Sequence, residues 1–556
     1  MPFNILIGGA AGQGIDTTAA IFEKLLKQAG YFVFTSRDFM SRVRGGHNFI
    51  LIRFGSEVIT SHSYRLDGIV ALNDETVSLH LDQLSPDGFI LGDVQLKTDD
   101  RRTLKIDMAR IAKELGNARA AGNVATGALL RLFGLDLAHV PMVLGTFIKA
   151  EYLEINQKAV RAGYDEAKTR FSAKPGDFAG RMILSGNSAV ALGALAAGLQ
   201  FYSAYPMSPS TSIMEYLAGQ GQACGVLVEQ AEDEIAGINM AIGASFAGVR
   251  AMTGTSGGGF SLKVEALGLA GMAEIPLVVI DVQRPGPATG LPTRTEQSDL
   301  RFVISAAQGE FPRMVIALKN QADAFYQTCR AFNLADKYQL PVILLSDQYL
   351  ADSSAAVPPF DLSGLDRWRQ DPAVLPAADY RRYLLTENGI SPRVLPGDPR
   401  LFATADSDEH DEWGRITESA DMRRQMMDKR LRKLLLLRQE LQEPEWIGPE
   451  DFDVLLLGWG SMHGPLAEAV CLLNAQPGQQ FAALVFGDIY PLPTALLLEK
   501  AGLARRIVNV EQNATGQMAG LIREHTGIQC VQSILKYDGR QLSGEEIAAQ
   551  ARAGGG

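Results

Sequence analysis

The sequence predicts an α/β protein with three domains, each built around a parallel sheet. Two observations predict this fold class. Short apolar segments, each long enough for a buried strand, alternate with helical patterns along most of the chain. The chain also has 556 residues, more than one hydrophobic core accommodates. We expect domains over 1–175, 181–355 and 451–556, with 356–450 forming a linker and an amphipathic helix.

The overall composition excludes several classes of protein. Hydrophobic residues make up 46% of the chain and charged residues 21%, as in ordinary globular proteins. The net charge of −11 argues against broad nucleic-acid binding, which requires a basic surface. No apolar stretch approaches the roughly 18 residues of a membrane-spanning helix, and the apolar run 5–7 is too short for a signal peptide. We therefore expect a cytoplasmic protein that binds neither nucleic acid nor membranes.

The cysteines are few and scattered along the chain. They are Cys224, Cys329, Cys471 and Cys530. Because no two are close enough for C-x-x-C ligation, we expect no zinc ribbon and no iron–sulfur cluster on this chain. His47 has no second His or Cys near it in the sequence, so we interpret it as a structural residue. No metal site is predicted.

The first domain begins with a glycine-rich turn between a strand and a helix. The strand covers 3–7, the turn reads GGAAGQG (8–14), and the helix covers 17–28. This geometry directs backbone N–H groups at a phosphate. The spacing G-x-x-G-x-G differs from the dinucleotide pattern G-x-G-x-x-G, which disfavours a nicotinamide cofactor. The alternative is that these glycines serve only a tight turn and close helix–sheet packing.

A basic turn follows in SRVRGGHNF (41–49). Arg42 and Arg44 lie beside two glycines, so we predict a phosphate contact here, with a solvated hairpin as the equally weighted alternative. Two further buried strands and a small-residue helix suited to close packing complete the domain, at 67–73, 88–94 and 118–135.

The second domain carries the leading candidate site. Four apolar segments are each followed by a polar or small-residue loop. In an open parallel sheet such loops gather at the carboxyl edge, where ligands bind. The loops are SAYPMSPST (203–211), EQAEDE (229–234), TGTSGGG (253–259) and VQRPGPATG (282–290). We expect them to form a crevice for an anionic ligand.

Charged residues in these loops suggest specific roles. Glu232 is predicted to face the sheet edge, where apolar surroundings raise the pKa of a carboxyl and let it share a proton with a heterocyclic nitrogen. The alternative for Glu232 is compensation of the helix dipole, which accounts for Asp233 and Glu234. Arg284 directly follows a strand and is well placed for bidentate recognition of a carboxylate.

The last part of the chain is predicted to be scaffold and interface. A basic amphipathic helix covers 420–441; its charge most simply forms a solvated face, with docking of a partner as the alternative. A strand–turn–helix rhythm then repeats, which predicts a smaller parallel α/β domain. No residues of this domain have the spacing expected of a catalytic nucleophile and its base.

The quoted loops resemble one family. YPMSPST (205–211) is similar to the Y-P-I-T-P-S/T loop of the 2-oxoacid:ferredoxin oxidoreductases, and the next three loops follow at that family's spacings. GGAAGQG and the Arg44 turn resemble the family's gamma domain. Three further segments resemble the family's C-terminal region: EHDEWG (409–414), MMDKRLRK (426–433) and VEQNATGQ (510–517). The resemblance covers essentially the whole chain, as a gamma–alpha fusion, and is greatest to 2-oxoglutarate-type members.

This resemblance implies a fold and a chemistry. The central domain would be a transketolase-like domain that binds the pyrimidine of thiamine diphosphate, and the last would resemble the transketolase C-terminal domain. The family decarboxylates a 2-oxoacid, passes electrons to ferredoxin and transfers the acyl group to coenzyme A. For this chain it implies conversion of 2-oxoglutarate to succinyl-CoA, or the reverse. The alternatives are pyruvate, branched-chain or aryl 2-oxoacids, or a stand-alone nucleotide-binding regulatory protein.

The resemblance also implies site residues. Glu232 matches the glutamate that hydrogen-bonds the aminopyrimidine and favours the imino tautomer, whose nitrogen removes the thiazolium C2 proton. Further cofactor contacts would come from Thr255, Ser256 and Gly257. Substrate contacts would come from Tyr205, Pro206, Ser208, Pro209 and Arg284. Coenzyme A handling would fall to Gly9, Gly12, Gln13, Gly14 and Arg44.

The sequence departs from the family pattern in informative places. Ser208 stands where Thr is usual, and Ser256–Gly259 reads S-G-G-G instead of S-G-P-G. The chain also lacks the G-D-G…N pattern that binds Mg²⁺-diphosphate, and it lacks a cysteine cluster. In the family, Mg²⁺ and the [4Fe-4S] cluster belong to a beta subunit. We therefore expect half an active site, completed by a beta subunit in an α₂β₂ assembly.

Overall fold

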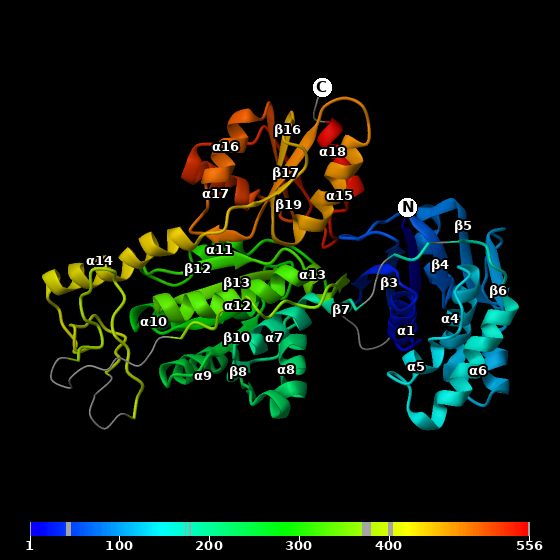
Figure 1. Cartoon of the computed structure of the whole chain (residues 1–556), viewed down its shortest axis with the longest axis horizontal. Coiled ribbons are helices and arrows are strands. Elements are labelled where there is room, and N and C mark those ends of the chain that lie inside the picture. The colour runs from blue at the N-terminus through cyan, green and yellow to red at the C-terminus, as the bar shows by residue number, and fades with distance from the viewer. Residues whose placement is uncertain are drawn as a thin grey trace. The chain divides into compact units, whose positions relative to one another are not determined.

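The computed structural model describes residues 2–40, 46–172, 174–176, 180–369, 380–397 and 404–553. The chain forms two compact units. The first contains Met1–Leu184 and Asp352–Pro359, and the second contains Ser185–Ala351 and Phe360–Gly556. They hold sheets of eight, seven and five strands, coloured from blue to red in Figure 1. The predicted α/β class with three sheets is confirmed.

The sheet of the first unit is mixed rather than parallel. Its strand order is β6-β5-β4-β1-β3-β2-β14-β7. β1 pairs in parallel with β4 and antiparallel with β3, and β2 is antiparallel to both of its neighbours, β3 and β14. The strands are β1 (Phe3–Ala10), β2 (Phe32–Asp38), β3 (His47–Gly55), β4 (Leu66–Ala71), β5 (Leu84–Asp93), β6 (Thr103–Ile106), β7 (Met182–Ser185) and β14 (Ser354–Val357).

Small residues let two helices of this unit pack closely. A Cβ on Gly127 of α4 would lie 1.9 Å from the carbonyl oxygen of Val160, and a Cβ on Gly163 of α6 would lie 1.9 Å from that of Val124. The predicted role of small residues in close packing is therefore confirmed. The helices are α1 (Ile15–Gln28), α2 (Asp74–His80), α3 (Met108–Glu114), α4 (Ala121–Leu132), α5 (Val140–Leu144) and α6 (Ala150–Glu166), with 3₁₀ turns at Leu81–Gln83 and Ala118–Ala120.

His47 has a histidine partner that sequence spacing did not show. Its Nε2 lies 2.8 Å from Nε2 of His80, and both rings are buried. Burial lowers the pKa of each imidazole, and the charge of His80 lowers that of His47 further. Folding therefore lowers the pKa of both histidines. At pH values below the ordinary histidine pKa of 6.5, the unfolded chain binds more protons than the folded chain does.

The first unit should therefore lose stability as the pH falls through about 6.5. The protection factors of β3 peptides, which correct for the slower intrinsic amide exchange at low pH, should fall over this range. His80→Gln should flatten the dependence, because it removes one of the two imidazoles. Equal protection factors at neutral and acidic pH in the unaltered chain would contradict this expectation.

The central sheet of the second unit aligns the predicted loops at one edge. Its order is β18-β12-β13-β11-β10-β8-β9, and all of its neighbours are parallel except β12 and β18. The strands are β8 (Phe201–Ala204), β9 (Leu227–Gln230), β10 (Ala251–Thr255), β11 (Leu277–Gln283), β12 (Met314–Ala317), β13 (Pro341–Asp347) and β18 (Asp488–Tyr490). The helices are α7 (Gly186–Ala196), α8 (Thr211–Cys224), α9 (Glu234–Phe246), α10 (Gly257–Met272), α11 (Leu300–Ile304), α12 (Gln321–Tyr338) and α13 (Gln348–Asp352).

The five-stranded sheet forms a three-layer domain. Its order is β15-β17-β16-β19-β20. α15 and α18 cover one face and α16 and α17 the other, as Figure 1 shows in orange and red. Its strands are β15 (Glu445–Ile447), β16 (Val454–Trp459), β17 (Phe481–Phe486), β19 (Arg506–Glu511) and β20 (Gln532–Leu535). Its helices are α15 (His463–Asn474), α16 (Ala495–Leu503), α17 (Gln517–Thr526) and α18 (Gly544–Ala553), with a 3₁₀ turn at Gly460–Met462.

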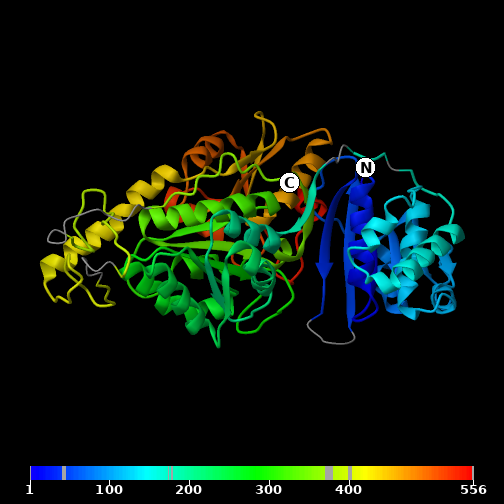
Figure 2. The ribbon, with the colours of Figure 1, turned by 60° about the horizontal axis from the view of Figure 1, so that its bottom comes forward.

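The basic helix α14 (Ala420–Leu437) is not merely a solvated face. It is the long yellow helix in Figures 1 and 2, followed by a 3₁₀ turn at Arg438–Glu440. Its buried stripe carries charge: Lys429 and Lys433 each lie 2.5 Å from a carboxylate oxygen of buried Glu274. Arg430 pairs with Glu409 at 2.8 Å. The motifs 409–414 and 426–433 thus meet in the fold.

Neither α14 nor any other described helix is long and apolar enough to span a membrane.

Candidate active site

A buried carboxyl group marks the edge of the central sheet. Glu234 opens α9 and is 4% exposed, and its Oε1 has no hydrogen-bond partner among the described residues. A Cβ on Gly259 would lie 2.7 Å from this oxygen and 2.1 Å from Oγ1 of Thr255. Only glycine therefore leaves room beside this carboxyl. A buried carboxyl without a partner costs free energy unless a ligand or water completes it.

Of the three neighbouring acids 232–234, the buried one is not the one that was predicted. Asp233 is the N-cap of α9, and its Oδ1 accepts the N–H of Ala236 at 2.8 Å. Glu232 precedes the helix and its side chain is exposed, so the structure does not bring it into the buried group. Glu234 occupies that place instead. The signal was present in the helical spacing, since Glu234 lies on the same face as Gly237 and Ile238, which are buried.

A buried lysine holds the start of α9. Lys263 of α10 is fully buried, and its Nζ donates to the carbonyl oxygen of Glu234 and to Oγ1 of Thr253, both at 3.0 Å. Burial lowers the pKa of Lys263 to about 8, although the charges of Glu234 and Asp233 oppose this shift. Its ammonium group therefore fixes the backbone that carries Glu234. Sequence reasoning missed this residue, because a lone lysine within an apolar helix carries no motif.

The first predicted loop is held from three sides. Asn187 of α7 donates to the carbonyl oxygen of Pro209 at 2.8 Å, and Ser210 Oγ donates to the carbonyl oxygen of Met207 at 2.8 Å. Arg284 Nη1 donates to the carbonyl oxygen of Ser208 at 2.7 Å. Arg284 and this loop are therefore brought together as predicted.

The side chains of the first loop differ in exposure. Pro209 is buried, whereas Tyr205 and Ser208 are exposed and Pro206 is half-buried. Thr255 reaches the loop from β10, with its Oγ1 lying 3.9 Å from the sulfur of Met207.

The start of α10 offers unpaired polar atoms. Ser256 is its N-cap and is fully buried, yet its Oγ has no hydrogen-bond partner in the described chain. Gly257, half-buried, begins the helix, and exposed Gly258 follows. Because the first N–H groups of a helix lack intrahelical acceptors, this end presents donors to an anion or a polar ring.

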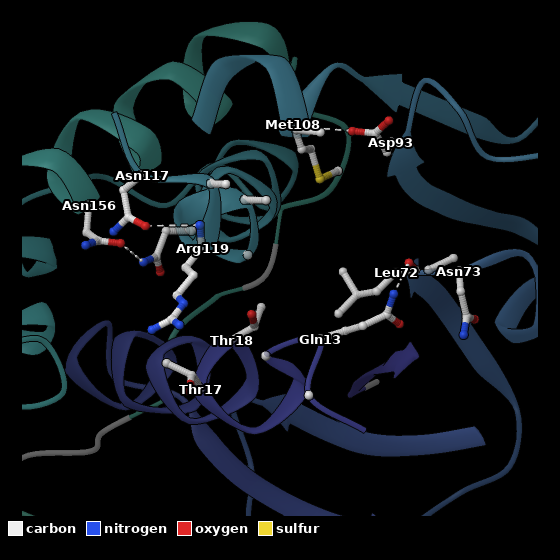
Figure 3. A pocket seen from close by; sticks show the side chains of 18 of the residues that line it. Gln13, Thr17, Thr18, Leu72, Asn73, Asp93, Met108, Asn117, Arg119 and Asn156 are labelled. Atoms are coloured by element: carbon white, nitrogen blue, oxygen red, sulfur yellow. Dashed lines mark hydrogen bonds between the residues drawn. The ribbon is translucent and has the colours of Figure 1, made fainter. Parts of the chain in front are cut away.

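A separate cavity of about 1240 Å³ lies in the first unit (Figure 3). Gly12, Gln13 and Gly14 line it, and both glycines have positive φ, 91° and 81°. Gly9 lies beneath it, since a Cβ there would meet Oε1 of Gln13 at 2.7 Å. That oxygen accepts the N–H of Ala10 at 2.7 Å, which fixes the glycine-rich turn. Arg44 and Arg42 lie outside the described residues.

The walls of this cavity combine amides with basic side chains. Asn123 donates to Asn156 at 2.7 Å on a buried floor. Arg119 extends toward the side of the cavity that holds the first turn of α1 (Figure 3). The exposed basic side chains at the cavity are Lys97, Arg119 and Lys149. Such a cavity suits a phosphorylated ligand with a polar ring.

Comparisons with known proteins show the family of this chain. The family model described as "Pyruvate flavodoxin/ferredoxin oxidoreductase, thiamine diP-bdg" matches residues 192–429, and "Pyruvate ferredoxin/flavodoxin oxidoreductase" matches 4–166. A 2-oxoacid:ferredoxin oxidoreductase alpha subunit from a Sulfolobus species is 33% identical over 98% of this chain and 96% of its own length. The chain belongs to the family of 2-oxoacid:ferredoxin oxidoreductase alpha subunits.

Two more relatives refine this membership. The 2-oxoglutarate oxidoreductase subunit KorA of Mycobacterium tuberculosis is 32% identical, over 80% of this chain and 69% of its own. The solved 2-oxoglutarate:ferredoxin oxidoreductase from Magnetococcus marinus, with 2-oxoglutarate, coenzyme A and succinyl-CoA bound, is 32% identical with a TM-score of 0.93, covering 99% of each chain. The chain is thus an oxidoreductase subunit.

The residues at the central edge fit a thiamine-type ring. Such a ring would take hydrogen bonds from buried polar atoms, and Glu234 Oε1 and Ser256 Oγ are two buried atoms without a partner in the described chain. The matched thiamine-binding region contains both. All four cysteines are free, and no cluster of three or more His, Cys, Asp or Glu suited to a metal occurs in the described part of the chain.

Proposed function

We propose that this chain supplies one wall of an active site that oxidatively decarboxylates 2-oxoglutarate to succinyl-CoA, or runs the reverse reaction, with ferredoxin as electron carrier. The observation that carries this proposal is Glu234, a buried carboxyl with an unpaired oxygen at the carboxyl edge of the central sheet. The solved relative from Magnetococcus marinus, which binds 2-oxoglutarate and succinyl-CoA, supports the choice of substrate.

Thiamine diphosphate, when bound, supplies the carbon nucleophile and the electron sink for decarboxylation. Glu234 would hold the pyrimidine, and its carboxyl would form a hydrogen bond with a ring nitrogen. This assignment replaces Glu232, whose exposed side chain lies outside the buried group. Ser256 Oγ and the first N–H groups of α10 would complete the contacts that this chain makes with the ring.

Arg284 would bind the carboxylate of the 2-oxoacid. Its guanidinium is half-buried and anchored to the carbonyl oxygen of Ser208, so it lies beside the loop 205–211. A planar guanidinium fixes both the position and the orientation of a carboxylate. Tyr205, Pro206 and Ser208 would face the substrate from the loop, and buried Pro209 would support them.

The chain would work only with a beta subunit. That partner would carry Mg²⁺ and the [4Fe-4S] cluster, and an α₂β₂ assembly would complete the site. The free cysteines and the cluster chemistry suit the reducing cytoplasm. Pyruvate, branched-chain and aryl 2-oxoacids are the alternative candidate substrates. The residues that select the distal group of the substrate would lie largely on the partner subunit.

Activity of the complex tests this function. The chain should be co-expressed with its cluster-bearing partner, and reduction of ferredoxin should be followed with several 2-oxoacids, with and without coenzyme A. We expect reduction that depends on both 2-oxoglutarate and coenzyme A. A cluster-loaded complex that reduces ferredoxin with none of the 2-oxoacids would refute the proposal.

The cavity of the first unit is proposed to hold coenzyme A. Its basic rim would bind phosphates, and its amide floor would accept the polar parts of the ligand. Arg119→Ala should raise the KM for coenzyme A about tenfold, the size expected for one charge-assisted contact, with kcat and the KM for 2-oxoglutarate little changed. Lys113→Ala, an exposed lysine that does not line the cavity, is the matched control. Equal KM values in both variants would rule out this cavity.

A further inference from the structure

The strand before Arg284 and the loop after it each carry a carboxyl group. Asp281 of β11 is fully buried, and neither of its carboxylate oxygens has a hydrogen-bond partner in the described chain. It lies in register with Thr255 on the neighbouring strand. The second carboxyl belongs to Asp299, at the end of the loop that begins at Arg284. Its Oδ2 is likewise buried and without a partner.

Asp299 is tied to both strand ends that form the site. Its main-chain N–H donates to Oε1 of Gln283 at 3.0 Å. Its carboxylate lies against the start of α10, since a Cβ on Gly257 would be 2.4 Å from Oδ2. Any larger residue at 257 would collide with Asp299. The carboxylate therefore lies beside Gly257, and Gln283, which the main chain of Asp299 contacts, directly precedes Arg284.

The loop that carries Asp299 is fixed by the C-terminal domain. Gln297 is fully buried; its N–H donates to the carbonyl oxygen of Gln512 at 2.7 Å, and its Nε2 donates to that of Trp459 at 3.1 Å. Asn513 donates to the carbonyl oxygen of Gln297 at 3.1 Å. This network keeps Asp299 from moving away when its charge changes.

Burial and nearby charges raise the pKa of Asp299 toward neutral. Burial and the charge of Glu296 raise it, the guanidinium of Arg284 opposes both, and the pKa that results is about 6. Burial and the charge of Asp299 together raise the pKa of Asp281 well above its ordinary value. The charged side chains that act on Asp299 in the described chain are thus Arg284, directly after β11, and Glu296 in the loop, and Asp299 in turn acts on Asp281. The N-terminus of α10 lies beside Asp299.

We propose that Asp299, backed by Asp281, is a positioning residue that sets the charge Arg284 presents to the substrate, so that binding of the 2-oxoacid carboxylate takes up a proton. This inference rests on the proposed function, which places that carboxylate on Arg284. When Asp299 is ionised it competes with the substrate for the guanidinium. When Asp299 is protonated, the full positive charge of Arg284 is available to the substrate.

Linkage fixes the sign of the effect. If a proton on Asp299 strengthens oxoacid binding, the bound oxoacid must raise the pKa of Asp299 by the same factor. Affinity for the oxoacid should therefore be higher below pH 6 than well above it. An electrostatic coupling of this kind typically changes affinity about fivefold or more.

Steady-state kinetics of the complete complex test this inference. The KM for 2-oxoglutarate should fall about fivefold as the pH is lowered through the pKa of Asp299, while kcat changes less. Asp299→Asn removes the titrating group and nearly keeps its shape, so its KM should be low and independent of pH. Glu296→Gln is the graded control: it removes a charge that raises the pKa of Asp299, so the midpoint should move to lower pH.

Calorimetry gives a readout that does not depend on turnover. Binding of 2-oxoglutarate, measured above pH 6 in buffers of different ionisation enthalpy, should show proton uptake by the native complex and none by Asp299→Asn. Should Asp299→Asn fail to fold, Glu296→Gln carries the test, because loss of its charge should shift the KM midpoint to lower pH, and an unchanged midpoint would contradict the inference.

Two results would overturn the inference. One is an active complex whose KM is independent of pH, and the other is pH dependence and proton uptake that persist in Asp299→Asn. A native complex that turns over no 2-oxoacid would instead overturn the proposed function and this inference with it. The native activity measured in the same experiment distinguishes the two failures.

Discussion

Glu234→Gln should lower turnover of the assembled enzyme by about 10²–10⁴, the range of a lost general acid–base contact. Glutamine nearly keeps the shape of the side chain but cannot exchange a proton with a ring nitrogen. Since Glu234 is buried and its Oε1 is unpaired, the amide should not disrupt an existing hydrogen bond at that atom. Assembly with the partner subunit and binding of coenzyme A should therefore be unchanged.

Glu232→Gln is the matched control for this prediction. It makes the same chemical change two residues earlier, at an exposed side chain. We expect turnover close to that of the unaltered enzyme, measured as ferredoxin reduction with 2-oxoglutarate and coenzyme A. If Glu232→Gln abolished turnover and Glu234→Gln did not, the roles assigned to these two residues would have to be exchanged.

The largest effect on stability is expected at Glu274. Burial alone would raise the pKa of this carboxyl, but the ammonium groups of Lys433 and Lys429 and the guanidinium of Arg382 hold it well below its usual range. Glu274→Gln would leave two buried ammonium groups without their counter-ion. We expect a loss of about 3–5 kcal/mol in the free energy of unfolding, measured by urea titration of the whole chain.

Two further variants check the origin of that loss. Arg424→Gln disrupts an ion pair with Asp421 on the exposed side of the same helix and should cost less than about 1 kcal/mol. Adding Lys433→Met to Glu274→Gln should recover part of the stability, because one unpaired buried charge is removed. If the double variant were less stable than Glu274→Gln, a shape defect rather than an unpaired charge would explain the loss.

The parallel sheets were predictable because local sequence carries their signal. Apolar segments of strand length alternate with helices, and β8, β10, β11 and β13 all lie where such segments occur. Antiparallel β14 was not predictable, because its pairing with β2 joins residues far apart in the chain. The same holds for the ion pairs of α14: the sequence shows charged residues at helical spacing but not the buried Glu274 that faces them.

The site was predictable in outline but not in every side chain. Strand-end loops and Arg284 come together as the topology requires. The choice among Glu232, Asp233 and Glu234 depends on where α9 begins, and a shift of two residues exchanges the exposed and the buried carboxyl. Lys263 and the network that links Gln297 to the C-terminal domain need the tertiary structure, because their partners are distant in sequence.

The central claim is that Glu234 activates a thiamine-type cofactor held at this sheet edge. The most direct measurement is the rate at which the reactive carbon of bound thiamine diphosphate exchanges its proton for deuterium in the assembled complex, without substrate. We expect exchange to be slowed at least about a hundredfold in Glu234→Gln and unchanged in Glu232→Gln. Exchange at the native rate in Glu234→Gln, with the cofactor fully bound, would contradict the claim.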